Sequence, residues 1–178
     1  MESFLVTEQR SAEGPRIWSL LRKAHPKSVI HATGFRDVTR FDVEGEVDDI
    51  ARETLREGTD RVGHLTLLQA EVESTCEAIE AASISVATEH VDPENSFCFR
   101  LHKRGAHWLE APSPTIEQEI GTAIGRALQE TYGREPLVDL RTPVVMIRAE
   151  VLGPVTAVGV SRRAWLGASV QEAQTEHE

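Results

Sequence analysis

The chain has 178 residues, of which 40% are hydrophobic, and a formal net charge of -10 at pH 7. This composition is typical of a soluble globular protein and is sufficient for one domain or two small ones. The sequence lacks a run of about 18 apolar residues, which excludes a membrane-spanning helix, and its first residues do not have the pattern of a signal peptide, so we expect a cytoplasmic location.

Short segments of alternating character in the first seventy residues predict two β-α-β patterns in succession. The apolar run Phe4–Val6 predicts a strand, and the amphipathic stretch Pro15–Ala24 predicts a helix, because proline suits the first helical turn. The later segments predict strands over 28–32 and 38–43, a helix over 47–55 and a strand over 61–68. This βαββαβ order is that of the ferredoxin-like plan, so we expect an α+β domain over residues 1–71.

A second set of elements begins where the composition changes, near Val72. The segment Ser74-Thr-Cys-Glu77 matches a capping box and predicts a helix that ends at Asp92-Pro93. The later segments predict a strand over 97–104, a helix from 115 to 132 and a hairpin with strands 143–152 and 156–161. We expect these elements to form an α/β domain over residues 72–166, followed by an acidic tail over 167–178.

The predicted helix of the second domain contains a GxxxG motif, formed by Gly121 and Gly125, beside an apolar stripe. Each glycine inside a helix costs about 1 kcal/mol relative to alanine, so a packing or functional need must offset that cost. Our interpretation is close packing of the helix on the sheet. The alternative is a helix backbone that approaches RNA.

Positive charge is concentrated in one segment of this acidic chain. Residues 96–108 carry Arg100, Lys103 and Arg104 and no acid, whereas residues 73–95 carry six acids and no Lys or Arg. The predicted strand alternates apolar side chains, which face the core, with polar and cationic side chains, which face outward: Phe97, Phe99 and Leu101 against Cys98, Arg100, His102 and Arg104. The alternative is an alternation of charge between strands and helices that has no function.

Over residues 72–166 the chain resembles the THUMP domain, an RNA-binding module. The resemblance rests on the order of four segments: Phe97–Arg104, Val138–Pro143, Val144–Gly153 and Ala157–Val160. It implies binding of tRNA, in which a preceding ferredoxin-like domain and the THUMP domain together hold the acceptor stem and the 3′ end.

The sequence after the predicted hairpin is too short for the catalytic domains that usually accompany this module. The chain is therefore similar to the adaptor that assists the RNA cytidine acetyltransferase in making N4-acetylcytidine in tRNA. This resemblance implies a non-enzymatic, tRNA-binding role, with that acetyltransferase or another modification enzyme as partner.

An RNA site on the basic strand would use its cations against phosphates, because guanidinium groups bind phosphate bidentately. A focused patch is needed, since the overall charge repels a polyanion. Trp108 is a candidate for stacking on an unpaired base, with core packing as the alternative, and Trp165 is a further candidate. The predicted RNA-binding set is Arg100, Lys103, Arg104, His107, Trp108, Arg141, Arg162 and Arg163.

Motifs of catalysis are missing from the sequence, which contains no GxGxxG, GxxxxGK[ST], HExxH or GxSxG. The seven histidines are scattered, and Cys76 and Cys98 lack CxxC spacing, so both cysteines are interpreted as buried small hydrophobes. We therefore expect no catalytic residues, no cofactor and no metal centre.

The sequence is also consistent with two functions that do not involve RNA. A scaffolding or small-ligand regulatory module predicts a cleft whose binding is indifferent to salt, and an unrecognised enzyme predicts a pocket with perturbed acids or histidines. RNA binding predicts a contiguous positive surface instead. The sequence does not predict an oligomeric state.

Overall fold

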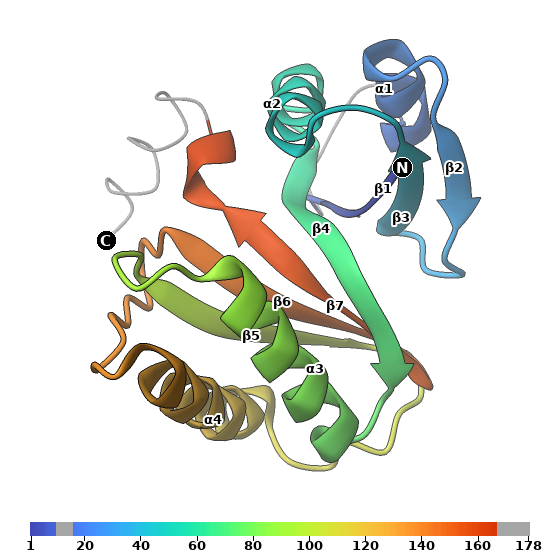
Figure 1. Cartoon of the computed structure of the whole chain (residues 1–178). Coiled ribbons are helices and arrows are strands. Elements are labelled where there is room, and N and C mark those ends of the chain that lie inside the picture. Colours follow the sequence, from blue (N-terminus) through green and yellow to red (C-terminus); the bar gives the residue numbers. More distant parts are fainter. Residues whose placement is uncertain (10–15, 167–178) are drawn as a thin grey trace. The chain divides into compact units, whose positions relative to one another are not determined.

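The computed structural model describes residues 1–9 and 16–166, which form two compact units. The first unit contains Met1–Leu67 and resumes at Arg162, and the second contains Leu68–Ser161 (Figure 1). Helices and strands occur in both, so the predicted α+β class is confirmed. The predicted helix start at Pro15 and the predicted tail over 167–178 lie outside the described residues. Among the described helices, none combines the length and apolar character that a membrane span requires.

The first unit has the βαββαβ order that the sequence predicts. Its elements are β1 (Glu2–Glu8), α1 (Ile17–Ala24), β2 (Val29–Ala32), β3 (Val38–Val43), α2 (Val47–Glu57) and the start of β4 (Val62–Glu73). The strands lie in the order β2-β3-β1-β4, and the pairs β2–β3, β1–β3 and β1–β4 are antiparallel. The helices α1 and α2 pack on each other and bury apolar residues such as Ile17, Leu21 and Ile50.

The chain returns to the core of the first unit at its far end. The short helix η1 (Arg163–Trp165) places Trp165 edge-on to Phe4, with the ring centroids 6.3 Å apart, and the indole Nε1 donates to Asp48 Oδ1 at 2.9 Å. Trp165 is 2% exposed. The interpretation of Trp165 as a base-stacking residue is therefore wrong, because its ring is part of a protein core.

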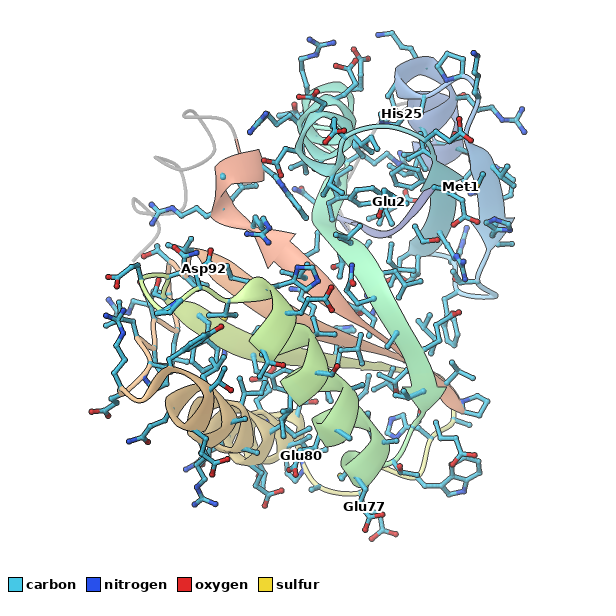
Figure 2. All side chains as sticks on the ribbon, in the orientation of Figure 1. Met1, Glu2, His25, Glu77, Glu80 and Asp92 are labelled. Carbon is cyan, nitrogen blue, oxygen red and sulfur yellow. The ribbon has the colours of Figure 1, made fainter. Side chains whose placement is uncertain are left out.

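His25 is buried in the first unit, where Figure 2 labels it. Its Nε2 lies 2.8 Å from Thr54 Oγ1, and its ring stacks on Phe41 with centroids 5.7 Å apart. Burial lowers the pKa of His25 because desolvation disfavours the imidazolium, although Glu53 acts in the opposite direction. The unfolded chain binds a proton near the ordinary pKa of about 6.5, and the folded chain binds it only at lower pH.

This difference predicts that stability falls as the pH is lowered below about 6.5, since the unfolded state then binds more protons than the folded state. Urea denaturation between pH 7.5 and pH 5 measures the effect. In the variant His25→Gln, which keeps a hydrogen-bonding group beside Thr54, the stability difference from wild type should shrink as the pH falls. A difference in unfolding free energy between variant and wild type that stays constant over this pH range would contradict the lowered pKa of His25.

The second unit is a four-stranded sheet covered on one face by two helices (Figure 1). It contains the rest of β4, α3 (Cys76–His90), β5 (Phe97–Arg104), α4 (Ser113–Tyr132), β6 (Val145–Leu152) and β7 (Val155–Arg162) up to Ser161. The strands lie in the order β4-β7-β6-β5, and β5 runs parallel to β6 from Phe97↔Val145 to Arg104↔Leu152. The predicted stripe of α4 is buried: Ile116, Ile120, Ile124 and Leu128.

The two cysteines have different environments. Cys98 on β5 is buried, and desolvation raises the pKa of its thiol to about 11. Cys76 is exposed, because it occupies the first turn of α3, whose buried residues begin at Ile79. The expectation of burial is confirmed for Cys98 and was wrong for Cys76.

Candidate nucleic-acid interface

β5 forms the outer edge of the second unit's sheet, because only one of its sides pairs with β6. On the other side, Phe97 N donates to Leu137 O at 2.9 Å, and Phe97 O accepts from Asp139 N at 3.1 Å. Backbone groups alternate sides along a strand, so the N–H groups of Phe99 and Leu101 face the same outer edge. Glu117 of α4 accepts the Leu101 N–H at 2.8 Å.

A groove of about 630 Å³ follows this edge between β5, α4 and the loop 135–140. Its lining combines apolar, polar and charged side chains with two glycines of α4. The apolar residues include Phe97, Phe99, Pro114, Pro136, Val138 and Leu140, the polar ones Gln118, Thr122 and Gln129, the charged ones Arg100, Glu117, Arg126 and Glu135, and the glycines are Gly121 and Gly125. The groove therefore offers apolar walls with amide groups and charges of both signs.

Arg100 connects the two walls of the groove. Its Nη2 donates to Leu140 O at 2.6 Å, and its Nη1 lies 3.7 Å from Glu117 Oε2. The side chain is partly exposed. Arg100 thus holds the loop and α4 in place and still presents part of its guanidinium to solvent.

Lys103 fixes the loop that follows β5. Its Nζ donates to Leu109 O at 3.0 Å and also to Ala111 O. Leu109 is buried, and its N–H donates to His107 Nδ1 at 3.3 Å. Between these anchors Trp108 is 75% exposed, so the core-packing alternative for Trp108 is wrong.

Arg104 is committed to an ion-pair cluster with Glu150 and Arg148. Glu150 Oε2 accepts from Arg104 Nη1, and Glu150 Oε1 accepts from Arg148 Nη2 at 2.7 Å. The side chains of Arg104, Arg148 and Glu150 are 13%, 8% and 1% exposed. The outward row of cations expected from strand alternation is therefore only partly present, because Arg104 turns to a buried carboxylate and Cys98 is buried.

The other predicted cations lie in different parts of the fold. Arg141 is exposed on a loop that Asp139 stabilises, since the carboxylate accepts the N–H groups of Arg141 and Thr142 at 2.9 and 3.0 Å. Arg162 and Arg163 belong to the first unit, whereas the remaining six predicted residues belong to the second. The structure thus gathers Arg100 and Arg141 on the groove and its adjoining loop.

Sequence reasoning missed a second stripe on α4. Gln118, Thr122, Gly125 and Gln129 recur at spacings of three and four residues, and all line the groove together with Arg126. Arg126 is exposed and has no ion-pair partner among the residues that the structure describes. The GxxxG motif was the visible signal of this stripe.

The groove has limited means for covalent chemistry. Cys98 lines it, but a pKa of about 11 keeps the thiol neutral and therefore a poor nucleophile. Within the described residues, no three His, Cys, Asp or Glu side chains come together as metal ligands. The lining residues that remain offer apolar surface, amide hydrogen-bonding groups and charged side chains.

Several solved structures share this fold. TrmN from Thermus thermophilus has a TM-score of 0.62 and 23% identity over 91% of this chain and 46% of its own. A predicted N6-adenine-specific DNA methylase from Listeria monocytogenes has a TM-score of 0.62 and 14% identity over 89% and 40%. A 4-thiouridine synthetase, in complex with RNA and with bound ATP, has a TM-score of 0.55 and 14% identity over 91% and 41%. The comparison with curated proteins gives no match.

These likenesses contradict the expectation that the chain is not an enzyme. The similar structures include a methylase and a thiouridine synthetase, so the fold is one that enzymes contain. The expectation rested on missing catalytic motifs and on the short remainder after the hairpin. This chain spans less than half the length of these three structures, so neither observation excludes a place in an enzyme.

The matched family covers the unit that carries the groove. Residues 73–161 match the THUMP domain, which is half of the chain, from the end of β4 to β7. The match includes β5, α4 and the loop 135–140. The resemblance drawn from four short segments is confirmed, and the chain belongs to the THUMP domain family.

Proposed function

We propose that this chain binds tRNA through its second unit and holds it for modification of a base. The observation that carries this proposal is the THUMP match over 73–161, which includes every wall of the groove. A structure of the same fold, the 4-thiouridine synthetase, is an RNA complex. The parts of the tRNA that we propose to be held are the acceptor stem and the 3′ end.

The charge distribution of the second unit supports a directed mode of binding. Residues 68–161 contain seven Lys and Arg against fourteen Asp and Glu, so the unit as a whole repels RNA. The acids include Glu77 and Glu80 near the start of α3, a helix without Lys or Arg (Figure 2). Three of the seven cations lie on β5, and one, Arg141, lies on the loop after 140, whereas α4 has a single cation, Arg126, and three acids. RNA would therefore approach the β5 edge and avoid α3.

Two roles follow for the predicted RNA-binding residues and for Arg126, which was not among them. Arg126, Arg141 and the exposed part of Arg100 contact phosphates, and Trp108 stacks on an unpaired base, because these groups reach solvent. Lys103, His107 and Arg104 position the loop and the strand through their intramolecular bonds. Arg162 and Arg163 bind RNA from the first unit, which we propose to have the ferredoxin-like plan.

The reaction that modifies the tRNA base is a separate part of this proposal. Cytidine N4-acetylation, with the RNA cytidine acetyltransferase as partner, stays a prediction that rests on the sequence resemblance. The similar structures, a methylase and a thiouridine synthetase, favour methylation or thiolation equally as contexts for this unit. Acetylation, methylation and thiolation of a tRNA base each require that the tRNA is bound.

A small ligand in the groove is the second candidate function. The groove volume of about 630 Å³ lies within the range of about 300–1,000 Å³ that is usual for small-molecule sites, and its lining mixes apolar walls with amides. Such a ligand would bind without strong dependence on salt, whereas RNA affinity falls steeply as salt rises.

Filter binding of the full chain to tRNA, with heparin as a polyanion of no sequence, tests the proposal. We expect tRNA to be preferred, because apolar walls and Trp108 recognise bases as well as charge. Equal affinity for the two polyanions would contradict tRNA recognition.

A further inference from the structure

The strand β4 continues past the strand with which its first half pairs. β4 ends at Glu73, but its antiparallel pairing with β1 ends at Leu67. In the order of the sheet, β4 has β1 on one side and β7 on the other, so β7 is the only neighbouring strand for residues 68–73 among the described strands (Figure 1). In the second unit, which begins at Leu68, β4 is therefore an edge strand.

An edge strand directs the backbone N–H and C=O groups of every second residue to a side where no strand pairs with them. The two edges of the second unit differ in this respect. At the β5 edge, the loop after 135 bonds to Phe97, and Glu117 accepts the Leu101 N–H. At the β4 edge, no strand of the described chain takes the place of β1 after Leu67. This edge can therefore accept an added strand.

The side chains of the β4 edge alternate between the two faces of the sheet, as they do in a strand that is buried on one face. The polar side chains are exposed and the apolar ones are half-buried. The exposed residues are Gln69, Glu71 and Glu73, and the half-buried ones are Leu68, Ala70 and Val72. A strand added here would meet an acidic face on one side and an apolar face on the other.

Negative charge determines which partner fits this edge. Residues 62–99 contain no Lys or Arg, and Glu71 and Glu73 are followed by Glu77 and Glu80 in α3 (Figure 2). RNA is repelled by such a surface. A second copy of the chain is also disfavoured, because antiparallel pairing of this strand with itself would bring acids opposite acids. The edge is complementary to a strand that carries cations.

We propose that residues 68–73 of β4 are a docking edge for an extended segment of a partner protein, in which Lys or Arg alternates with apolar residues. The segment adds to the sheet as a further strand, with its cations beside Glu71 and Glu73 and its apolar side chains beside Ala70 and Val72. Main-chain hydrogen bonds supply affinity in this mode of binding, and the alternating side chains supply specificity. The inference is independent of the proposed RNA binding, which uses the β5 edge.

Titration of the ¹⁵N-labelled full chain with the capped peptide Lys-Val-Lys-Val-Lys-Val tests the inference. We expect amide chemical-shift changes and slower amide hydrogen exchange to centre on residues 68–73, because their free backbone groups become paired. The same peptide with every backbone nitrogen methylated keeps its charge but has no N–H to donate, so it should not bind. Binding of the methylated peptide with similar affinity, or shift changes confined to other residues, would overturn the inference.

The variant Glu73→Lys tests the contribution of charge. Glu73 is exposed, so its melting temperature should stay close to that of the wild type. Affinity for the peptide should fall about fivefold, because an attractive cross-strand pair becomes a repulsive one.

Glu119→Lys is the matched control, since Glu119 is an exposed acid of α4 and its replacement changes the total charge by the same amount. This variant should change the peptide affinity by less than about twofold. Equal losses of peptide affinity in the two variants would overturn the inference, because the peptide would then respond only to overall charge. Failure of the wild-type chain to bind the peptide would overturn it as well and would leave the proposed tRNA binding intact.

Discussion

Replacing Glu150 by alanine is expected to lower the free energy of unfolding by about 3–5 kcal/mol, the usual cost of removing one partner from a buried ion pair. The Glu150 carboxylate is 1% exposed and accepts from both Arg104 and Arg148. Without it, two guanidinium groups of low exposure face each other with no carboxylate between them. The loss should exceed that of any single exposed ion pair of the chain.

Urea denaturation at pH 7 measures this effect, and Glu94→Ala is the matched control. Glu94 pairs with Arg134 at 2.8 Å, but the two side chains are largely exposed, so the control should lose less than about 1 kcal/mol. A similar loss of unfolding free energy in both variants would contradict the structural role of the cluster.

The same cluster predicts that Arg104→Glu unfolds the chain, because the new carboxylate would lie beside that of Glu150. Loss of RNA binding in that variant would therefore not identify a phosphate contact.

Charge reversal at Arg126 or at Arg141 is expected to weaken tRNA binding about tenfold in each case. Both side chains are exposed, Arg126 in the groove and Arg141 on the loop that follows Leu140. Each lost phosphate contact should also reduce by about 1 the slope of log affinity against log salt. The thermal stability of both variants should stay close to that of the wild type, because neither side chain is part of a core.

Arg134→Glu is the control for net charge. Arg134 is an exposed cation of the same unit that pairs with Glu94 and does not line the groove. It changes the total charge of the chain by the same amount, so tRNA affinity should change by less than about threefold. Equal losses of tRNA affinity in all three variants would show that binding depends only on the overall charge of the chain. The groove would then have no specific role in binding.

Local signals in the sequence were sufficient for most of the elements. Period-two alternation bounded by turn residues predicted β3 and β5 with their observed ends, Val38–Val43 and Phe97–Arg104. The α3 cap is Thr75, whose Oγ1 accepts from Ala78 N at 3.2 Å, one residue after the predicted start of the capping box. The return of the chain to the first unit at Arg162 was not predicted, because it depends on contacts of Trp165 with Phe4 and Asp48, which are far away in sequence.

The candidate site was predicted less completely, for a physical reason. Local charge density identified β5, but the partner of Arg104 lies 46 residues away, and the parallel register that pairs His102 with Glu150 brings it close. The groove was missed because it lies between three segments, 97–100, 114–129 and 135–140, whose spacing is a tertiary property. The two glycines of α4 were noticed, but the groove that they line depends on the tertiary position of the loop 135–140, which the sequence pattern does not give.

We expect the second unit to recognise tRNA by its bases as well as its charge. The most direct measurement is the dissociation constant of the full chain for tRNA and for heparin across a fourfold range of salt. Four to six phosphate contacts predict that tRNA affinity falls on the order of a hundredfold or more over this range, with tRNA preferred over heparin at every salt concentration. An affinity that is indifferent to salt, or equal for the two polyanions, would contradict the claim.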